Sequence, residues 1–207
     1  MRTIHLGTGP EDISRAVEVL RGGGIVAFPT DTVYGIGAHG MLPQAVDKLY
    51  AAKERPRDKA IPLLLPGPEA LPALVAAVPE AARALAACFW PGALTIVLRR
   101  SPNVPDAVTA GGETVAVRVP DHALTLALLR ALAAPLAATS ANLSGEPAPD
   151  TAEGVLVQLE GRIDLILDGG RCPGSVASTV VDLTVDPPAV LRAGEIGLDA
   201  LRRAIGL

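Results

Sequence analysis

Short apolar segments alternate with helical segments along this chain, and this alternation restricts the fold more than any other feature. Apolar runs, several of them bounded by glycine or proline, predict strands at 2–6, 24–29, 60–65, 94–100, 114–120, 135–141, 163–170, 177–184 and 189–194. Apolar residues at helical spacing predict helices at 11–24, 43–55, 79–89, 122–133, 152–161 and 197–207. The alternation is typical of the α/β class.

The order of these segments also indicates how the sheet is built. The last two strands follow one another without a helix, so we expect some antiparallel pairing within a mixed sheet. Pro62 within the 60–65 segment indicates an edge strand or a bulge. The sequence contains no internal repeat and no low-complexity linker. We therefore expect residues 1–207 to form one domain.

The composition bears on the core and on the partners. Hydrophobic residues make up 49% of the chain and aromatic residues only 2%, so the core must be aliphatic. The net charge of −4 and the few aromatic rings argue against a nucleic-acid surface. Cys88 and Cys172 are interpreted as ordinary thiols of a reducing compartment. No signal peptide or membrane span is visible in the sequence, so a cytoplasmic protein is expected.

The segment FPTDTVYGIG, residues 28–37, places several polar side chains directly after an apolar strand. Thr30, Asp31, Thr32 and Tyr34 stand within five residues. Such a cluster suits a turn in which side chains bond the local backbone. It equally suits a loop that holds a ligand, because ligands of open α/β sheets bind beyond the carboxyl ends of strands.

The segment KERPRDK contains four cations in seven residues: Lys53, Arg55, Arg57 and Lys59. An exposed helix end would explain them, since basic side chains suit the C-terminus of a helix dipole. In a chain of negative net charge, the same cluster also suits a cradle for phosphate groups.

Two further polar segments follow or precede strands. TSANLSG offers small hydroxyl groups and an amide, including Ser140 and Asn142, but it is neither a Walker loop nor a Rossmann fingerprint. SVASTVVD offers Ser175, Ser178 and Thr179. Each segment suits either a turn or an anion site.

Arg118 and Arg192 each lie within an apolar strand segment. A buried arginine is costly unless it is paired, and neither has an obvious carboxylate nearby in the sequence. A surface-facing position or an anionic ligand would explain each. Because side chains alternate along a strand, Arg118 is expected to face away from Val117 and Val119, toward a cavity wall.

Seven segments together carry a resemblance. PTDTVYGIG, KERPRDKAIPLLL, WPGALTIVL, TVAVRVP, TSANLSG, STVVDLT and VLRAGEI occur in one order. In that order they resemble the YrdC-like family of L-threonylcarbamoyladenylate synthases in its short, single-domain form, over about residues 22–207. The resemblance implies an α/β domain in which a twisted mixed parallel/antiparallel sheet, flanked by helices, forms a concave ligand cavity.

The resemblance also implies a reaction. L-threonine, bicarbonate and ATP would give L-threonylcarbamoyladenylate and pyrophosphate, with Mg²⁺ accompanying ATP. The product would supply the threonylcarbamoyl group of N6-threonylcarbamoyladenosine at position 37 of tRNA, through a downstream TsaD-type transferase complex. Binding of tRNA itself would be weak or indirect, and no membrane would be involved.

Residue roles follow from the same resemblance. Lys53 and Arg55 are expected to be catalytic, at the triphosphate and the bicarbonate-derived oxygen. Threonine contacts are expected from Thr32, Arg118, Ser140 and Ser178. ATP contacts are expected from Arg55, Lys59, Thr114, Asn142 and Arg192. The resemblance assigns no metal ligands.

Two alternatives remain beside the synthase. YciO-like paralogues share the fold but tend to lack part of a Lys-Arg-Ser-Asn set that this chain has complete, as Lys53, Arg55, Ser140 and Asn142. An RNA-binding module of the same fold is disfavoured by the charge and by the scarcity of aromatic residues.

Overall fold

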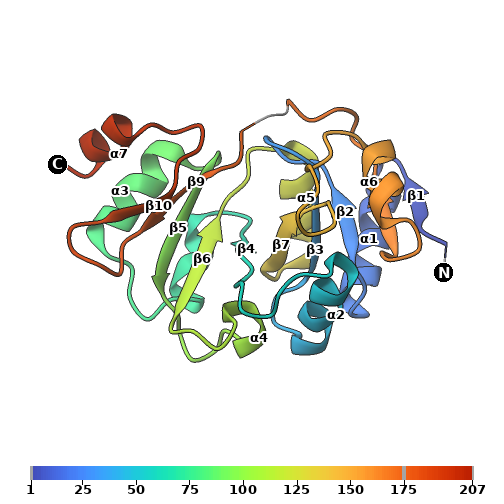
Figure 1. Ribbon diagram of the computed structural model, residues 1–207, viewed down its shortest axis with the longest axis horizontal. Helices are drawn as coiled ribbons and strands as arrows, with labels where there is room; N and C mark the ends of the chain where they lie inside the picture. Colours follow the sequence, from blue (N-terminus) through green and yellow to red (C-terminus); the bar gives the residue numbers. More distant parts are fainter. Residues whose placement is uncertain (1, 174–175, 207) are drawn as a thin grey trace.

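A single mixed sheet runs through the molecule (Figure 1). The structure is a computed structural model that describes residues 2–173 and 176–206. In these residues ten strands follow the order β1-β8-β2-β3-β7-β4-β6-β5-β9-β10. They are Ile4–Leu6 (β1), Val26–Phe28 (β2), Gly35–His39 (β3), Leu63–Leu64 (β4), Leu94–Arg99 (β5), Thr114–Arg118 (β6), Leu136–Ser140 (β7), Leu165–Leu167 (β8), Thr179–Asp182 (β9) and Ala189–Arg192 (β10). The predicted mixed α/β class is confirmed.

The short strand β4 joins two halves of the sheet. It pairs antiparallel with β7 on one side and parallel with β6 on the other. The expectation of an edge strand or a bulge at Pro62 is therefore wrong. Pro62 lies just before the strand, so its missing N–H removes no ladder hydrogen bond, and its carbonyl oxygen accepts from the backbone N–H of Ala138 at 2.9 Å.

Helices cover both halves (Figure 1). Helices α3 and α7 pack together beside the β5–β9–β10 edge, while α1, α2, α5 and α6 surround the other half. None of the helices within the described ranges is long and apolar enough to cross a bilayer. The α-helices are Pro10–Arg21 (α1), Pro43–Lys53 (α2), Glu80–Phe89 (α3), Asp106–Thr109 (α4), Ala123–Leu132 (α5), Ala152–Leu159 (α6) and Leu198–Ala204 (α7), with a 3₁₀ helix η1 at Pro68–Ala73.

Strand β3 was not predicted, and it changes the reading of the polar segment after β2. It pairs antiparallel with β2 and with β7, so the polar residues 30–34 form the connection of a hairpin. Gly37 permits this close packing, because a Cβ atom there would lie 2.8 Å from the Leu136 side chain. The hairpin connection consequently lies beside the end of β7, where the TSANLSG segment begins.

Candidate functional site

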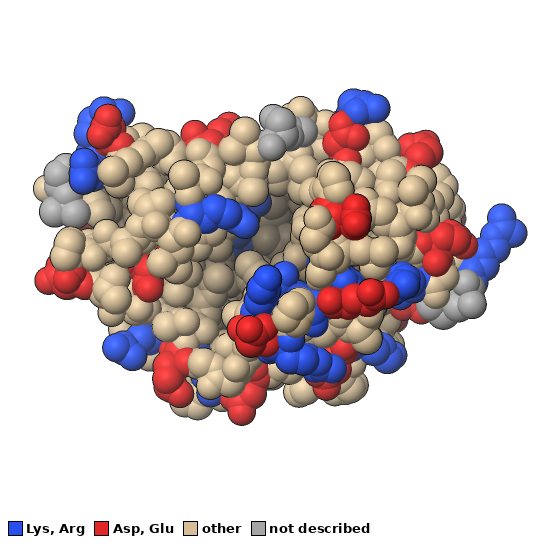
Figure 2. All heavy atoms as spheres, in the orientation of Figure 1, with Lys and Arg blue, Asp and Glu red and all other residues tan. Residues whose placement is uncertain are grey.

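A cavity of about 500 Å³ lies where the two halves of the sheet meet. Figure 2 shows a hollow near the middle of the displayed face, with basic side chains beside it. The volume lies in the range typical of small-molecule sites. The lining residues come from both halves of the sheet: Phe28, Thr30, Thr32, Val33, Tyr34, Gly35, Arg55, Ala60, Pro62, Leu64, Thr95, Arg118, Pro120, Ala138, Thr139, Ser140, Ala148, Ala177, Ser178 and Arg192.

The structure brings most of the predicted site residues to this one cavity. Its walls include Thr32, Arg55, Arg118, Ser140, Ser178 and Arg192, which come from segments far apart in the sequence. The other four predicted residues, Lys53, Lys59, Thr114 and Asn142, are not among the lining residues.

The connection between β2 and β3 presents one hydroxyl group with a defined direction. Thr30 Oγ1 donates to the Val33 carbonyl oxygen at 2.7 Å and lies 3.0 Å from Thr32 Oγ1. Because the single proton of Thr30 is used, Thr32 must be the donor of the second bond. The lone pairs of Thr32 are then directed to other donors, which suits a cavity ligand that carries an N–H group.

Tyr34 anchors this connection to the opposite loop. Its hydroxyl group donates to the Gly170 carbonyl oxygen at 2.8 Å and accepts from the backbone N–H of Gly169 at 3.2 Å. Burial raises the pKa of the Tyr34 phenol well above its ordinary value. The phenol therefore stays protonated and positions the loop.

Arg118 points into the cavity from the end of β6, and it is paired. Val117 and Val119 are buried and do not line the cavity, as the alternation of side chains predicts. Its Nε donates to the Gly92 carbonyl oxygen at 2.9 Å, and Nη2 lies 2.7 Å from both carboxylate oxygens of Asp31. No carboxylate is near Arg118 in the sequence, but the fold brings Asp31 to it across 87 positions.

Arg192 and Ser178 form a second polar group on the wall. Arg192 donates from Nε to the Ser178 carbonyl oxygen and from Nη2 to Ser178 Oγ, both at 2.9 Å. A register shift between Val190 and Arg192 redirects the side chains at the end of β10. Gly194 allows the chain after β10 to lie close to the Ala177 backbone, because a Cβ atom at Gly194 would lie 2.3 Å from the Ala177 carbonyl oxygen.

Thr95 was missed by the sequence reasoning. Its Oγ1 lies 2.8 Å from Ser178 Oγ, and its side chain lines the cavity from β5. A hydroxyl residue within the otherwise aliphatic strand LTIVL was the available signal. Ser175, which stood in the same predicted cluster as Ser178, lies outside the described residues.

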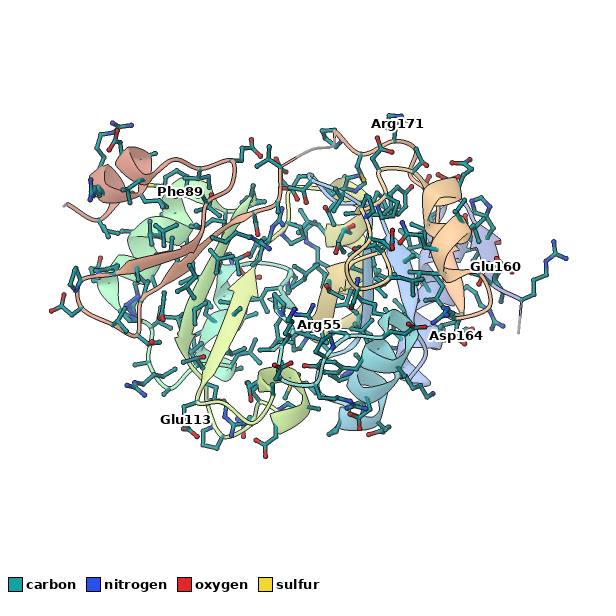
Figure 3. The ribbon with its side chains drawn as sticks, in the orientation of Figure 1. Arg55, Phe89, Glu113, Glu160, Asp164 and Arg171 are labelled. Atoms are coloured by element: carbon teal, nitrogen blue, oxygen red, sulfur yellow. The ribbon has the colours of Figure 1, made fainter. Side chains whose placement is uncertain are left out.

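Arg55 reaches the cavity from the turn after α2. Glu54 ends the helix in the left-handed region with φ 53°, and the chain then turns toward the center of the molecule, where Figure 3 labels Arg55. Arg55 donates to the carbonyl oxygens of Lys59 and Ala60 at 3.1 and 2.9 Å. Burial lowers the pKa of Arg55, as it does for Arg192, whose pKa the neighboring Arg118 lowers further.

Lys53 is buried, which corrects the expectation of an exposed helix end. Only 2% of its surface is accessible. Nζ donates to the Ser140 carbonyl oxygen, to the Asn142 carbonyl oxygen at 2.5 Å and toward Asn142 Oδ1 at 3.4 Å. Burial, and to a lesser extent the charge of Arg55, lowers the pKa of Lys53 to about 7. Lys53 therefore holds the turn that carries Ser140.

The remaining predicted contacts lie away from the cavity wall. Asn142 donates from Nδ2 to the carbonyl oxygens of Leu143 and Glu146 at 2.7 and 2.8 Å, so it shapes its own turn. Lys59 is exposed, and its backbone carbonyl helps to hold Arg55. Thr114 begins β6, at the opposite end of the strand from Arg118. Their contacts with ATP stay predictions.

The described residues contain no group of three or more His, Cys, Asp or Glu side chains arranged to hold a metal ion. Asp31, the ion-pair partner of the wall residue Arg118, lies 2.7 Å from its Nη2.

Comparison with known proteins gives one consistent family. Residues 18–194 match the family model for Sua5, YciO and YrdC, described as "Telomere recombination". The threonylcarbamoyl-AMP synthase of Bacillus subtilis (strain 168) is 46% identical over 208 residues, which cover 99% of this chain and 59% of the relative. The chain thus spans little more than half the length of that curated relative.

Two solved structures are similar over nearly all of the chain. The crystal structure of P. abyssi Sua5 complexed with L-threonine matches with a TM-score of 0.94 and 42% identity, over 100% of this chain and 61% of that one. The crystal structure of E. coli YciO matches with a TM-score of 0.85 and 28% identity, over 97% of this chain and 98% of that one.

Proposed function

The chain belongs to the Sua5, YciO and YrdC family, and from this premise we propose that it is a threonylcarbamoyl-AMP synthase. Its substrates would be L-threonine, bicarbonate and ATP, and its products L-threonylcarbamoyladenylate and pyrophosphate. The observation that supports this proposal best is the shared cavity, where Arg118, Arg55 and Arg192 offer three separate anion contacts.

We place threonine at the Arg118 end of the cavity. Three of the five N–H groups of Arg118 are used by Gly92 and Asp31, so the two on Nη1 remain for a ligand carboxylate. The Thr32 hydroxyl, already a donor to Thr30, would accept from the amino group. A relative's structure in complex with L-threonine supports this ligand.

We place the phosphates of ATP at Arg55 and Arg192. Both guanidinium groups donate only to backbone carbonyl oxygens or a hydroxyl group in the described structure, so their charge is available to a polyanion. Mg²⁺ would enter with ATP as part of the substrate. It would be held mainly by phosphate oxygens, because Mg²⁺ that accompanies a nucleotide takes most of its ligands from the phosphates and from water and few from the protein.

The proposed chemistry is nucleotidyl transfer. The threonine amine attacks the carbon of bicarbonate with loss of water, and an oxygen of the resulting carbamate attacks the α-phosphorus of ATP as pyrophosphate leaves. Such a reaction depends on positioning and on charge neutralisation more than on a protein nucleophile. The aliphatic walls at Leu64, Ala138 and Ala177 would keep water from the labile product.

The product would then pass to a TsaD-type transferase that modifies adenosine 37 of tRNA, with little direct tRNA binding by this chain. The net charge of −4 supports the expectation of little direct tRNA binding.

Pyrophosphate release tests the proposed function. We expect release to require L-threonine and bicarbonate together, because the carbamate must form before it can attack ATP. Release would be followed by a coupled pyrophosphatase assay with each substrate omitted in turn. Equal turnover of ATP without threonine would contradict the synthase and indicate a nucleotidase.

Arg118→Lys separates the two ends of the cavity. Lysine keeps the positive charge, but it cannot bond Gly92, Asp31 and a carboxylate in the planar geometry of arginine. We expect threonine binding to weaken by about 1–3 kcal/mol, with ATP affinity changed less than about twofold. Calorimetry with each ligand separately is the measurement. Weaker ATP binding with unchanged threonine binding would reverse the assignment of the two ends.

A further inference from the structure

We propose that Asp31 is a specificity-determining residue that keeps polyphosphate out of the amino-acid end of the cavity. The proposal rests on the proposed function, because it concerns how one cavity sorts a zwitterionic amino acid from ATP. It assigns to Asp31 a task that goes beyond positioning Arg118.

The three cavity arginines differ in how their charge is balanced. Asp31 approaches Arg118 with both carboxylate oxygens at 2.7 Å, and the side chains of this ion pair are only 10% and 15% exposed. In the described part of the chain, no carboxylate lies within ion-pair distance of Arg55 or Arg192. Of the three cavity arginines, Arg118 therefore has its charge balanced by a carboxylate, whereas Arg55 and Arg192 have no such partner among the described residues.

This difference matches the charges of the two proposed ligands. A zwitterionic amino acid has no net charge, so it needs directed N–H groups, which Arg118 Nη1 provides, and no excess of cations. A polyphosphate carries several negative charges and needs unbalanced cations. Near Arg118 it would also meet the negative charge of Asp31, and like charges in a partly buried site repel strongly.

Loss of the Asp31 charge should leave the positive charge of Arg118 unbalanced, so that all three cavity arginines attract polyphosphate. Arg118 lies close enough to Arg192 to lower the pKa of Arg192, after the larger effect of burial. With Arg118 unbalanced, these two arginines would form one cationic surface with Arg55, and a polyphosphate could lie across the threonine end. Asp31→Asn makes this change while it keeps the size of the side chain and one oxygen acceptor for Arg118.

The experiment measures competition between threonine and inorganic pyrophosphate by calorimetry. Threonine is titrated into the parent protein and into Asp31→Asn, with and without pyrophosphate at ten times its own Kd for each protein. In the parent we expect pyrophosphate to change the Kd of threonine less than twofold. In Asp31→Asn we expect it to raise that Kd about tenfold, as mutually exclusive binding requires.

Asp47→Asn is the matched control, because it removes the same charge from an exposed ion pair with Arg57, outside the cavity lining. It should behave as the parent does. Competition in the parent protein would overturn the proposal, whether or not Asp31→Asn folds, and so would independent binding in a folded Asp31→Asn. If threonine does not bind the parent at all, the proposed function fails and this inference fails with it.

Discussion

Replacing Arg55 by alanine is expected to lower kcat/KM for ATP by about 100-fold or more, the typical effect of removing a group that stabilises charge in a transition state. Arg55 is one of two cavity arginines with no carboxylate partner in the described structure, so its charge is directed at a ligand. The variant should fold normally. The two carbonyl oxygens that Arg55 bonds belong to exposed residues, Lys59 and Ala60, and water can replace it there.

Arg57→Ala is the matched control for Arg55→Ala. Arg57 lies two positions away, pairs with Asp47 at the surface and stacks over the Tyr50 ring at 5.0 Å, but it does not line the cavity. We expect its kcat/KM to stay within about twofold of the parent. Near-normal activity in Arg55→Ala would contradict the assignment of Arg55, and so would a thermal unfolding temperature far below that of the parent.

Lys53→Met is expected to lower both stability and activity. Methionine fills much of the same space but leaves the buried carbonyl oxygens of Ser140 and Asn142 without their donor, at a cost of about 1–3 kcal/mol. For a chain of this length that corresponds to a loss of roughly 3–10 °C in Tm. Because the turn that carries Ser140 would shift, kcat/KM should fall by about 100-fold.

The free energy of unfolding that Lys53→Met loses relative to the parent should increase as the pH rises. Burial holds the pKa of Lys53 in the folded state near 7, below its ordinary value of 10.5. Between those two pH values the unfolded chain binds more protons than the folded one, so the free energy of unfolding rises with pH. Urea unfolding at pH 6 and pH 9 should therefore show a rise in the parent protein that is reduced in Lys53→Met.

Lys48→Met is the control for this position. Lys48 lies on the same helix and donates to a single carbonyl oxygen, that of Gly23, at 2.9 Å. Its loss should leave activity within about twofold of the parent. If Lys53→Met keeps the parent's Tm and activity, the hydrogen bonds of Lys53 to Ser140 and Asn142 have no functional importance. If Lys48→Met loses as much, the effect belongs to the helix as a whole.

Most of the regular elements were predictable because their patterns are local, but the short helices η1 and α4 were not predicted. Helix α1 and strands such as β5 follow from apolar spacing within a dozen residues or fewer. Strand β3 was missed because GIGAH contains a single β-branched residue, Ile36, between two glycines. It is held in the sheet by β2 and β7 on its two sides. Two glycines in five residues look like a turn until the packing against Leu136 is known.

The candidate site was predictable in its residue types but not in its pairings. Lys53 could have been recognised as buried, because Val46, Leu49 and Tyr50 precede it on one helical face at spacings of seven, four and three residues. The Asp31–Arg118 pair could not, since it joins residues 87 positions apart through the arrangement of the whole sheet. The spacing of residues in the sequence indicates which of them share a face of a helix. Which side chains pair across the sheet depends on the topology of the whole fold.

The proposed function requires that threonine, bicarbonate and ATP react together in one cavity. Its most direct test is mass spectrometry of a reaction with ¹³C-bicarbonate, L-threonine and ATP, quenched early. We predict an adenylate that contains threonine and one ¹³C atom, formed together with pyrophosphate and absent when threonine is omitted. Formation of AMP or ADP at the same rate without threonine, with no labelled adenylate, would contradict it.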